Sequence, residues 1–160
     1  MMVSLLVLWI HVLSAIFWVG GMLFLTVVLA PVLRSESGKP ETYAFFKKVA
    51  RRFRNGVWVA ILFLVLTGTV LLANQVSFGI PLRQWPNVVL IKLALVFVLI
   101  VFAGLHDLVI GPRAGVLKKK PPTFLTTGER TLLTLSPWFA RSILVLGVAV
   151  VMTGTAISRW

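Results

Sequence analysis

The stretch from residue 3 to residue 33, VSLLVLWIHVLSAIFWVGGMLFLTVVLAPVL, contains no formally charged side chain. A helix needs about 20 mostly apolar residues to cross the hydrocarbon core of a bilayer. Three further apolar stretches follow, at residues 56–76, 87–110 and 137–158. Because backbone polar groups in lipid must be satisfied within the spanning segment, we expect each of the four stretches to be a transmembrane helix.

The composition of the whole chain agrees with this prediction. Of its 160 residues, 59% are hydrophobic and only 12% are charged, whereas charged residues make up roughly 25% of a soluble domain. Four spans leave no room for a second, soluble domain. The sequence therefore predicts an all-α integral membrane four-helix bundle, with residues 1–160 forming a single transmembrane domain.

The distribution of Lys and Arg predicts the orientation. Residues 34–54 hold seven of these residues and residues 113–130 hold five, whereas the middle connection holds only Arg83. The positive-inside rule then places the first and third connections in the cytoplasm and both termini on the periplasmic side of a bacterial inner membrane. We attribute the net charge of +12 to topology and anionic lipid, and expect no nucleic-acid partner.

Three local patterns predict the ends of the spans. Residues 41–55 place apolar side chains at helical spacing among five Lys and Arg residues, which predicts a basic amphipathic helix in the interface before the second span. Gly111-Pro112 predicts the end of the third span. Ser136 before Pro137 has the pattern of an N-cap followed by the first residue of the fourth span.

The chain has no cysteine, so iron–sulfur clusters, thiolate zinc sites and covalent c-type haem are excluded. The remaining candidates are polar residues inside the spans, which are costly in lipid and mark functional sites by default. These candidates are His11, Lys92, His106, Asp107 and, near one end of its span, Arg141.

His11 shares one helix face with Trp18 and Met22, while Gly20 and Gly21 leave room for a flat group or a close backbone. The functional interpretation is an imidazole that ligates a metal or haem iron, with Trp18 and Met22 lining the site. The alternative is close helix packing, with His11 hydrogen-bonded to a neighbouring helix.

Lys92 and His106 also share a face, since 14 residues correspond to about four helical turns. We expect His106 to be a second haem or metal ligand, and Lys92 to pair with a carboxylate such as a haem propionate or to extend to the interface. Asp107 points about 100° away from His106, so we expect it to meet an arginine instead. Arg51 and Arg141 are candidates for binding the inner propionates.

The run from His11 through Trp18 to Gly21, followed by Pro31 and Arg34, resembles the first helix of the CopD-like and HemJ-like membrane proteins. Trp85, Lys92, His106 and Gly111-Pro112-Arg113 extend the resemblance to the third span. The resemblance implies a four-helix core that handles haem or copper. It also implies a haem ligand at His11 and an essential lysine at Lys92.

The sequence thus predicts a b-type haem protein that acts in electron transfer, an oxidoreductase activity being less favoured. The alternative is a copper- or porphyrin-handling protein, that is, a CopD-like copper transporter or a HemJ-like protoporphyrinogen oxidase. His11 lies toward the outer side and His106 toward the inner side, so straight helices keep them apart. We therefore expect a parallel homodimer, the commonest symmetric assembly, together with a redox partner.

Overall fold

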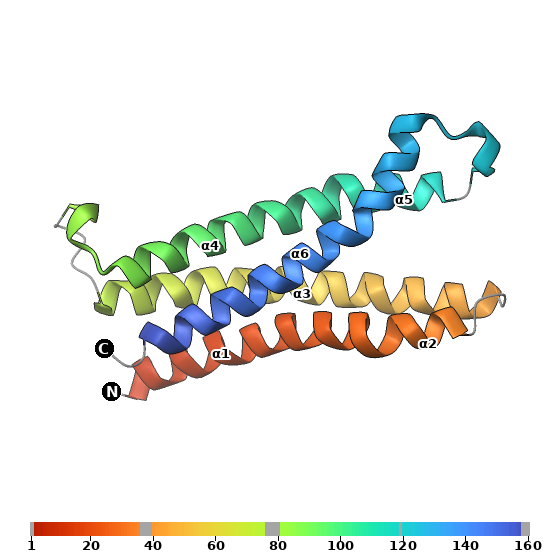
Figure 1. Ribbon diagram of the computed structural model, residues 1–160. Coiled ribbons are helices and arrows are strands. Elements are labelled where there is room, and N and C mark those ends of the chain that lie inside the picture. The colour runs from red at the N-terminus through yellow and green to blue at the C-terminus, as the bar shows by residue number, and fades with distance from the viewer. Residues whose placement is uncertain (1, 36–39, 76–80, 119, 158–160) are drawn as a thin grey trace. The chain divides into compact units, whose positions relative to one another are not determined.

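The computed structural model describes residues 2–35, 40–75, 81–118 and 120–157. Four long helical segments account for nearly all of them (Figure 1). Four helices are long and apolar enough to cross a membrane, covering Met2–Leu33, Ala44–Asn74, Asn87–Leu117 and Thr127–Thr155. The all-α fold with four membrane-length helices is confirmed, while the sidedness of the termini stays a prediction.

The chain divides into two compact units, Met1–Trp85 and Pro86–Trp160. The first unit is a helical hairpin. Its first arm joins α1 (Met2–Leu23), the π-helix η1 (Phe24–Leu29) and α2 (Ala30–Ser35), and its second arm is α3 (Pro40–Gln75). α1 and α3 run side by side (Figure 1). A short 3-10 turn, η2 (Leu82–Gln84), follows the hairpin.

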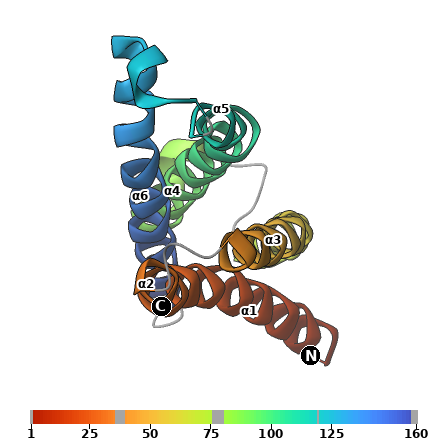
Figure 2. The ribbon, with the colours of Figure 1, turned by 90° about the vertical axis from the view of Figure 1, so that its right-hand side faces the viewer.

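The second unit is another helical hairpin. Its first arm joins α4 (Asn87–Gly104), the π-helix η3 (Leu105–Ile110) and α5 (Gly111–Leu117). After a 3-10 turn, η4 (Pro122–Phe124), the second arm is α6 (Thr127–Ile157). Figures 1 and 2 both show α6 lying beside α4, and these two helices form the main contact of the unit.

Large apolar side chains cover the outside of these helices. Val27 is 64% exposed, Phe97 is 70% exposed and Leu108 is 72% exposed. Exposing this apolar surface to water would cost free energy, whereas lipid tails are as apolar as the side chains themselves. The exposed surface therefore agrees with a multi-pass membrane protein.

The third span does not end at Gly111-Pro112, so this prediction was wrong. The Gly111 N–H bonds to the carbonyl of His106, five residues back, and the helix continues to Leu117. A proline lacks a backbone N–H and is tolerated in a first helical turn, where that donor has no partner to lose. Pro112 lies in the first turn of α5, directly after the wider turn of η3.

The fourth span was predicted to start at Pro137, and this was also wrong. α6 begins ten residues earlier, at Thr127, and Pro137 lies inside it. The true start is a capping box: the Thr126 backbone N–H donates to Glu129 Oε2 at 2.9 Å, and the Glu129 N–H donates to Thr126 Oγ1 at 3.4 Å. This reciprocal pair satisfies N–H groups that a helix start leaves unpaired.

The basic segment at residues 41–55 and the second span form one helix, α3, rather than two elements. The last residue predicted for this span, at position 76, lies outside the described residues, as does position 158 of the fourth span. Part of the basic segment packs against the first arm, because the ring of Phe53 lies 5.7 Å from the ring of Phe17. The amphipathic segment is thus a continuation of the span.

Candidate functional site

His11 is half-buried on α1, and its imidazole contacts α3. His11 Nδ1 lies 2.8 Å from the hydroxyl oxygen of Thr67, a side chain that is only 8% exposed. The same hydroxyl donates its hydrogen to the backbone carbonyl of Phe63, one turn earlier on α3. Histidine, threonine and carbonyl therefore form a short hydrogen-bonded chain between the two arms of the hairpin.

The chain of hydrogen bonds fixes which nitrogen of His11 carries the proton. A threonine hydroxyl has one hydrogen to donate, and at Thr67 it goes to the Phe63 carbonyl. The His11–Thr67 bond must then be donated by Nδ1–H, so the lone pair of the neutral ring lies on Nε2. Metal-ligating histidines have this arrangement, with one ring N–H donated to an oxygen and the other nitrogen acting as the ligand.

Gly68 makes the approach of this imidazole possible. A Cβ added at Gly68 would lie 3.3 Å from His11 Cε1, tighter than ordinary van der Waals contact. Consecutive residues of α3, Thr67 and Gly68, thus supply the hydrogen-bond acceptor and the space for the ring. Neither residue was predicted from the sequence, because the role of each depends on which helices pair.

Trp18 and Met22 were predicted to line a site beside His11. Trp18 is a core residue, 5% exposed, and Met22 is half-buried. The space left by Gly21 is filled by the ring of Phe53 from α3, whereas nothing described lies within 4 Å of a Cβ added at Gly20. The alternative of close helix packing therefore accounts for Gly21, and a hydrogen bond to a neighbouring helix is present at His11.

His106 and Asp107 form a second polar pair, in the π-helix η3. His106 Nδ1 lies 3.0 Å from Asp107 Oδ1, with the two side chains 25% and 20% exposed. The prediction that Asp107 would avoid His106 was wrong, because it assumed the 100° step of an α-helix, and the wider π-helical turn separates neighbouring residues by a smaller angle. A carboxylate only accepts, so Nδ1–H donates to Asp107, and in the neutral form of the ring the lone pair is on Nε2.

Lys92 is half-buried near the start of α4 and lies against α6. Its Nζ is 3.3 Å from where a Cβ of Gly154 would be, so the absence of that Cβ gives the ammonium its place. No hydrogen bond or ion pair links Lys92 to another residue in the described part of the chain. A half-buried ammonium without a partner in the protein requires an anion, a lipid headgroup or water beside it.

Arg51 and Arg141, the two arginines predicted to bind propionates, lie on α3 and α6. Arg51 is exposed on α3, and the guanidinium of Arg141 lies 5.0 Å from the ring of Trp138 on its own helix. Lys92 and His106 share a helical arm but are about 21 Å apart along it. Each hairpin thus carries one histidine with its Nδ1 engaged. Within the described ranges, no group of three or more His, Cys, Asp or Glu side chains converges on a metal position.

Comparison with known proteins gives a family without an assigned activity. Residues 13–121, more than half of the chain, match the family described as a domain of unknown function (DUF4149). Over 111 residues the chain is 38% identical to an uncharacterized protein of Aquifex aeolicus (strain VF5), covering 68% of this chain and 71% of that relative. No solved structure matches. The matched region includes Lys92 and His106, whereas His11 lies just before its start.

Proposed function

The chain belongs to the DUF4149 family, and for this member we propose a membrane-bound haem b protein that acts in electron transfer, with His11 as an iron ligand. One observation carries the proposal. The Thr67 hydroxyl, committed to the Phe63 carbonyl, accepts Nδ1–H of His11 and leaves the ring lone pair on Nε2. That is the protonation state in which an imidazole ligates iron.

The ligand inventory favours haem over a protein-bound metal ion. A zinc or copper ion held by protein alone needs three or four convergent ligands, and the described residues contain no such group of His, Cys, Asp and Glu side chains. A porphyrin supplies four nitrogens itself, so one or two histidines complete the iron. The resemblance to HemJ-like proteins supports a haem- or porphyrin-binding core, while the resemblance to CopD-like proteins keeps copper as the alternative.

Several residues of the chain would each have a separate role in binding haem. Thr67 orients the His11 ring and raises its basicity by accepting a hydrogen bond from Nδ1–H. Asp107 does the same for His106, which is the second candidate ligand. Lys92 has no carboxylate partner among the described residues. This favours a ligand that carries carboxylates of its own, as haem does. When bound, haem supplies one-electron chemistry at its iron. We further propose a homodimer in a bacterial inner membrane, with a separate redox partner.

The test is the visible spectrum of the purified protein, recorded oxidised and dithionite-reduced after expression with a haem precursor. We expect a b-type spectrum whose α band sharpens on reduction, and its loss in His11→Ala. The variant His106→Ala reports whether the second histidine is also an axial ligand. A colourless protein under these conditions, with normal folding, would contradict the proposed function.

A further inference from the structure

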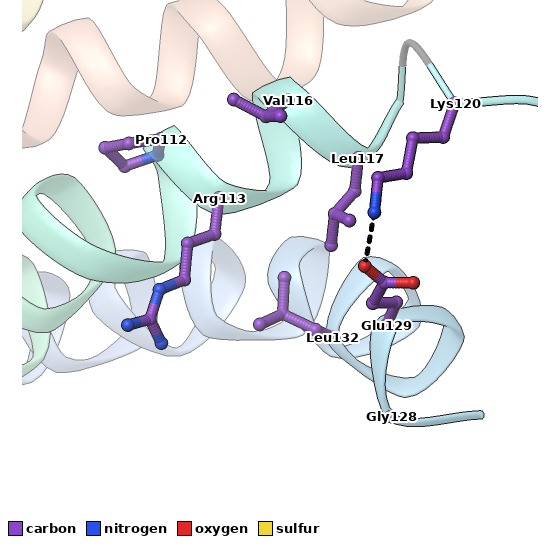
Figure 3. Close-up of a pocket in the computed structure, with 8 residues that line it drawn as sticks. All are labelled: Pro112, Arg113, Val116, Leu117, Lys120, Gly128, Glu129 and Leu132. Carbon is purple, nitrogen blue, oxygen red and sulfur yellow. Dashed lines mark hydrogen bonds and ion pairs between the residues drawn. The ribbon is translucent and has the colours of Figure 1, made fainter. Parts of the chain in front are cut away.

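A recess lies where the second hairpin turns, between α5 and the start of α6. Its volume is about 540 Å³, and its lining combines apolar and charged side chains (Figure 3). The lining residues are Pro112, Arg113, Val116, Leu117, Lys120, Gly128, Glu129 and Leu132. This recess lies in one unit of the chain and includes none of the residues used in the proposed haem site.

The charges of the recess are arranged unevenly. Lys120 Nζ lies 2.8 Å from Glu129 Oε1, so these two charges offset each other at one end. Arg113 extends from the other side, with the apolar side chains of Leu117 and Leu132 between (Figure 3). No ion pair joins Arg113 to another residue that the structure describes. The recess therefore presents one cation without a counter-charge beside an apolar floor.

The depth of the recess matches the polar layer of a membrane. Arg113 follows Asn87, the first residue of its arm, by 26 residues, which corresponds to roughly 39 Å of helix. The hydrocarbon core is only about 30 Å thick. When the start of α4 lies at one boundary of the core, Arg113 lies among the headgroups of the opposite leaflet. The positive-inside rule predicts that leaflet to be the cytoplasmic one.

We propose that this recess binds an anionic phospholipid. The Arg113 guanidinium holds the phosphate, a geometry for which its planar donors are suited, and Val116, Leu117 and Leu132 contact the acyl chains. Charge complementarity selects this occupant, because basic pockets between transmembrane helices at the cytoplasmic side bind anionic headgroups. The inference does not depend on the proposed haem site.

Glu129 controls how much positive charge the recess presents. Its carboxylate holds Lys120 and also accepts the Thr126 N–H of the capping box. Glutamine accepts the same backbone hydrogen bond, so Glu129→Gln preserves the helix start while releasing Lys120. The substitution should therefore strengthen the binding of an anionic lipid, whereas a purely structural role of Glu129 predicts no gain.

The experiment measures lipid binding to the full chain in detergent by native mass spectrometry, with phosphatidylglycerol and phosphatidylcholine as probes. We expect preference for phosphatidylglycerol, a loss of about fivefold in its affinity in Arg113→Gln, and a similar gain in Glu129→Gln. Arg83→Gln, which removes an exposed cation from the other unit, is the matched control and should change little.

Three outcomes would overturn the proposal. The first is equal binding of the two lipids by the unaltered protein. The second is unchanged phosphatidylglycerol affinity in both Arg113→Gln and Glu129→Gln, which covers the case in which one variant fails to fold. The third is competition by glycerol phosphate at concentrations comparable to the lipid, since that would identify a site for free phosphate rather than for a phospholipid.

Discussion

At the scale of single residues, the properties of His11 are set by an adjacent helix. The histidine is visible in the sequence as a lone polar residue in an apolar span, but its tautomer depends on Thr67 and Phe63 of α3. Sequence reasoning found the imidazole and missed its acceptor, because a threonine in a span usually hydrogen-bonds its own helix. The Thr67 hydroxyl donates to its own helix and also accepts a hydrogen bond from His11. The second bond can be recognised only once α1 and α3 are known to pair.

Thr67→Val removes this acceptor while keeping the shape of the side chain. We expect haem affinity to fall by about 10- to 100-fold, the usual cost of losing the residue that hydrogen-bonds a ligating imidazole. Thr69→Val is the matched control, because Thr69 is exposed on the same helix and its hydroxyl donates to the Val65 carbonyl of that helix. Haem titration of both proteins measures the difference, and equal affinities would refute the role of Thr67.

Replacing Lys92 should change the stability of the haem-free and the haem-bound protein differently. Without an anion, a half-buried ammonium in a span is a cost, so Lys92→Met should stabilise the haem-free protein by about 1 kcal/mol. If Lys92 binds a propionate, the same substitution should weaken haem retention. Thermal unfolding in detergent with and without haem measures both effects. An equal gain in stability with and without haem would contradict a ligand role, because it would show that haem retention is unchanged.

At the scale of elements, glycines and aromatic rings set the packing of the first hairpin. The Phe53 ring of α3 occupies the position of a Cβ on Gly21, and a Cβ on Gly56 would lie 2.8 Å from the Phe17 ring of α1. Each helix therefore places a ring on a glycine of the other. The sequence predicted room at residues 20 and 21 but could not indicate that the Phe53 side chain fills the space at Gly21.

Gly21→Ala and Gly20→Ala separate packing from helix propensity. Gly21→Ala should destabilise the protein by roughly 1–3 kcal/mol, because Phe53 must move. Gly20→Ala should be neutral or slightly stabilising, since nothing described lies near its Cβ and alanine favours the helix. Midpoints of thermal unfolding in the same detergent compare the neighbouring substitutions, and equal effects would show that the interlock of rings and glycines is unimportant.

The ends of the elements were the least predictable part of the fold. Proline signals at 112 and 137 suggested boundaries, yet both residues lie inside helical arms. Pro112 follows a π-helical turn that a periodicity argument based on the α-helix cannot detect. The start of α6 was encoded in the sequence by Thr126 and Glu129, a capping-box spacing that outweighs the proline signal ten residues later.

At the scale of the whole molecule, hydropathy alone predicted four membrane-length helices, and the structure contains them. Their lengths of 29 to 32 residues exceed what the hydrocarbon requires, so the helices tilt or extend into the headgroup layers. Hydropathy could not predict the partners of His11, His106 and Lys92, because those depend on which helices pair and in what register.

The orientation can be tested directly because the chain has no native cysteine. Single cysteines at Gln84 and at Lys118, which replace exposed residues in different connections, should react differently with a membrane-impermeant maleimide added to intact cells. The positive-inside rule predicts labelling at position 84 and protection at position 118 until the cells are opened. The reverse pattern would invert the topology and place the lipid recess in the outer leaflet.

The central claim, that the imidazole of His11 ligates haem, is tested most directly by replacing the side chain and returning the imidazole as a free ligand. We predict that His11→Gly loses the b-type spectrum and that added imidazole restores it, since Thr67 and Gly68 still provide the acceptor and the space for the ring. An unchanged spectrum in His11→Gly without imidazole would contradict the claim.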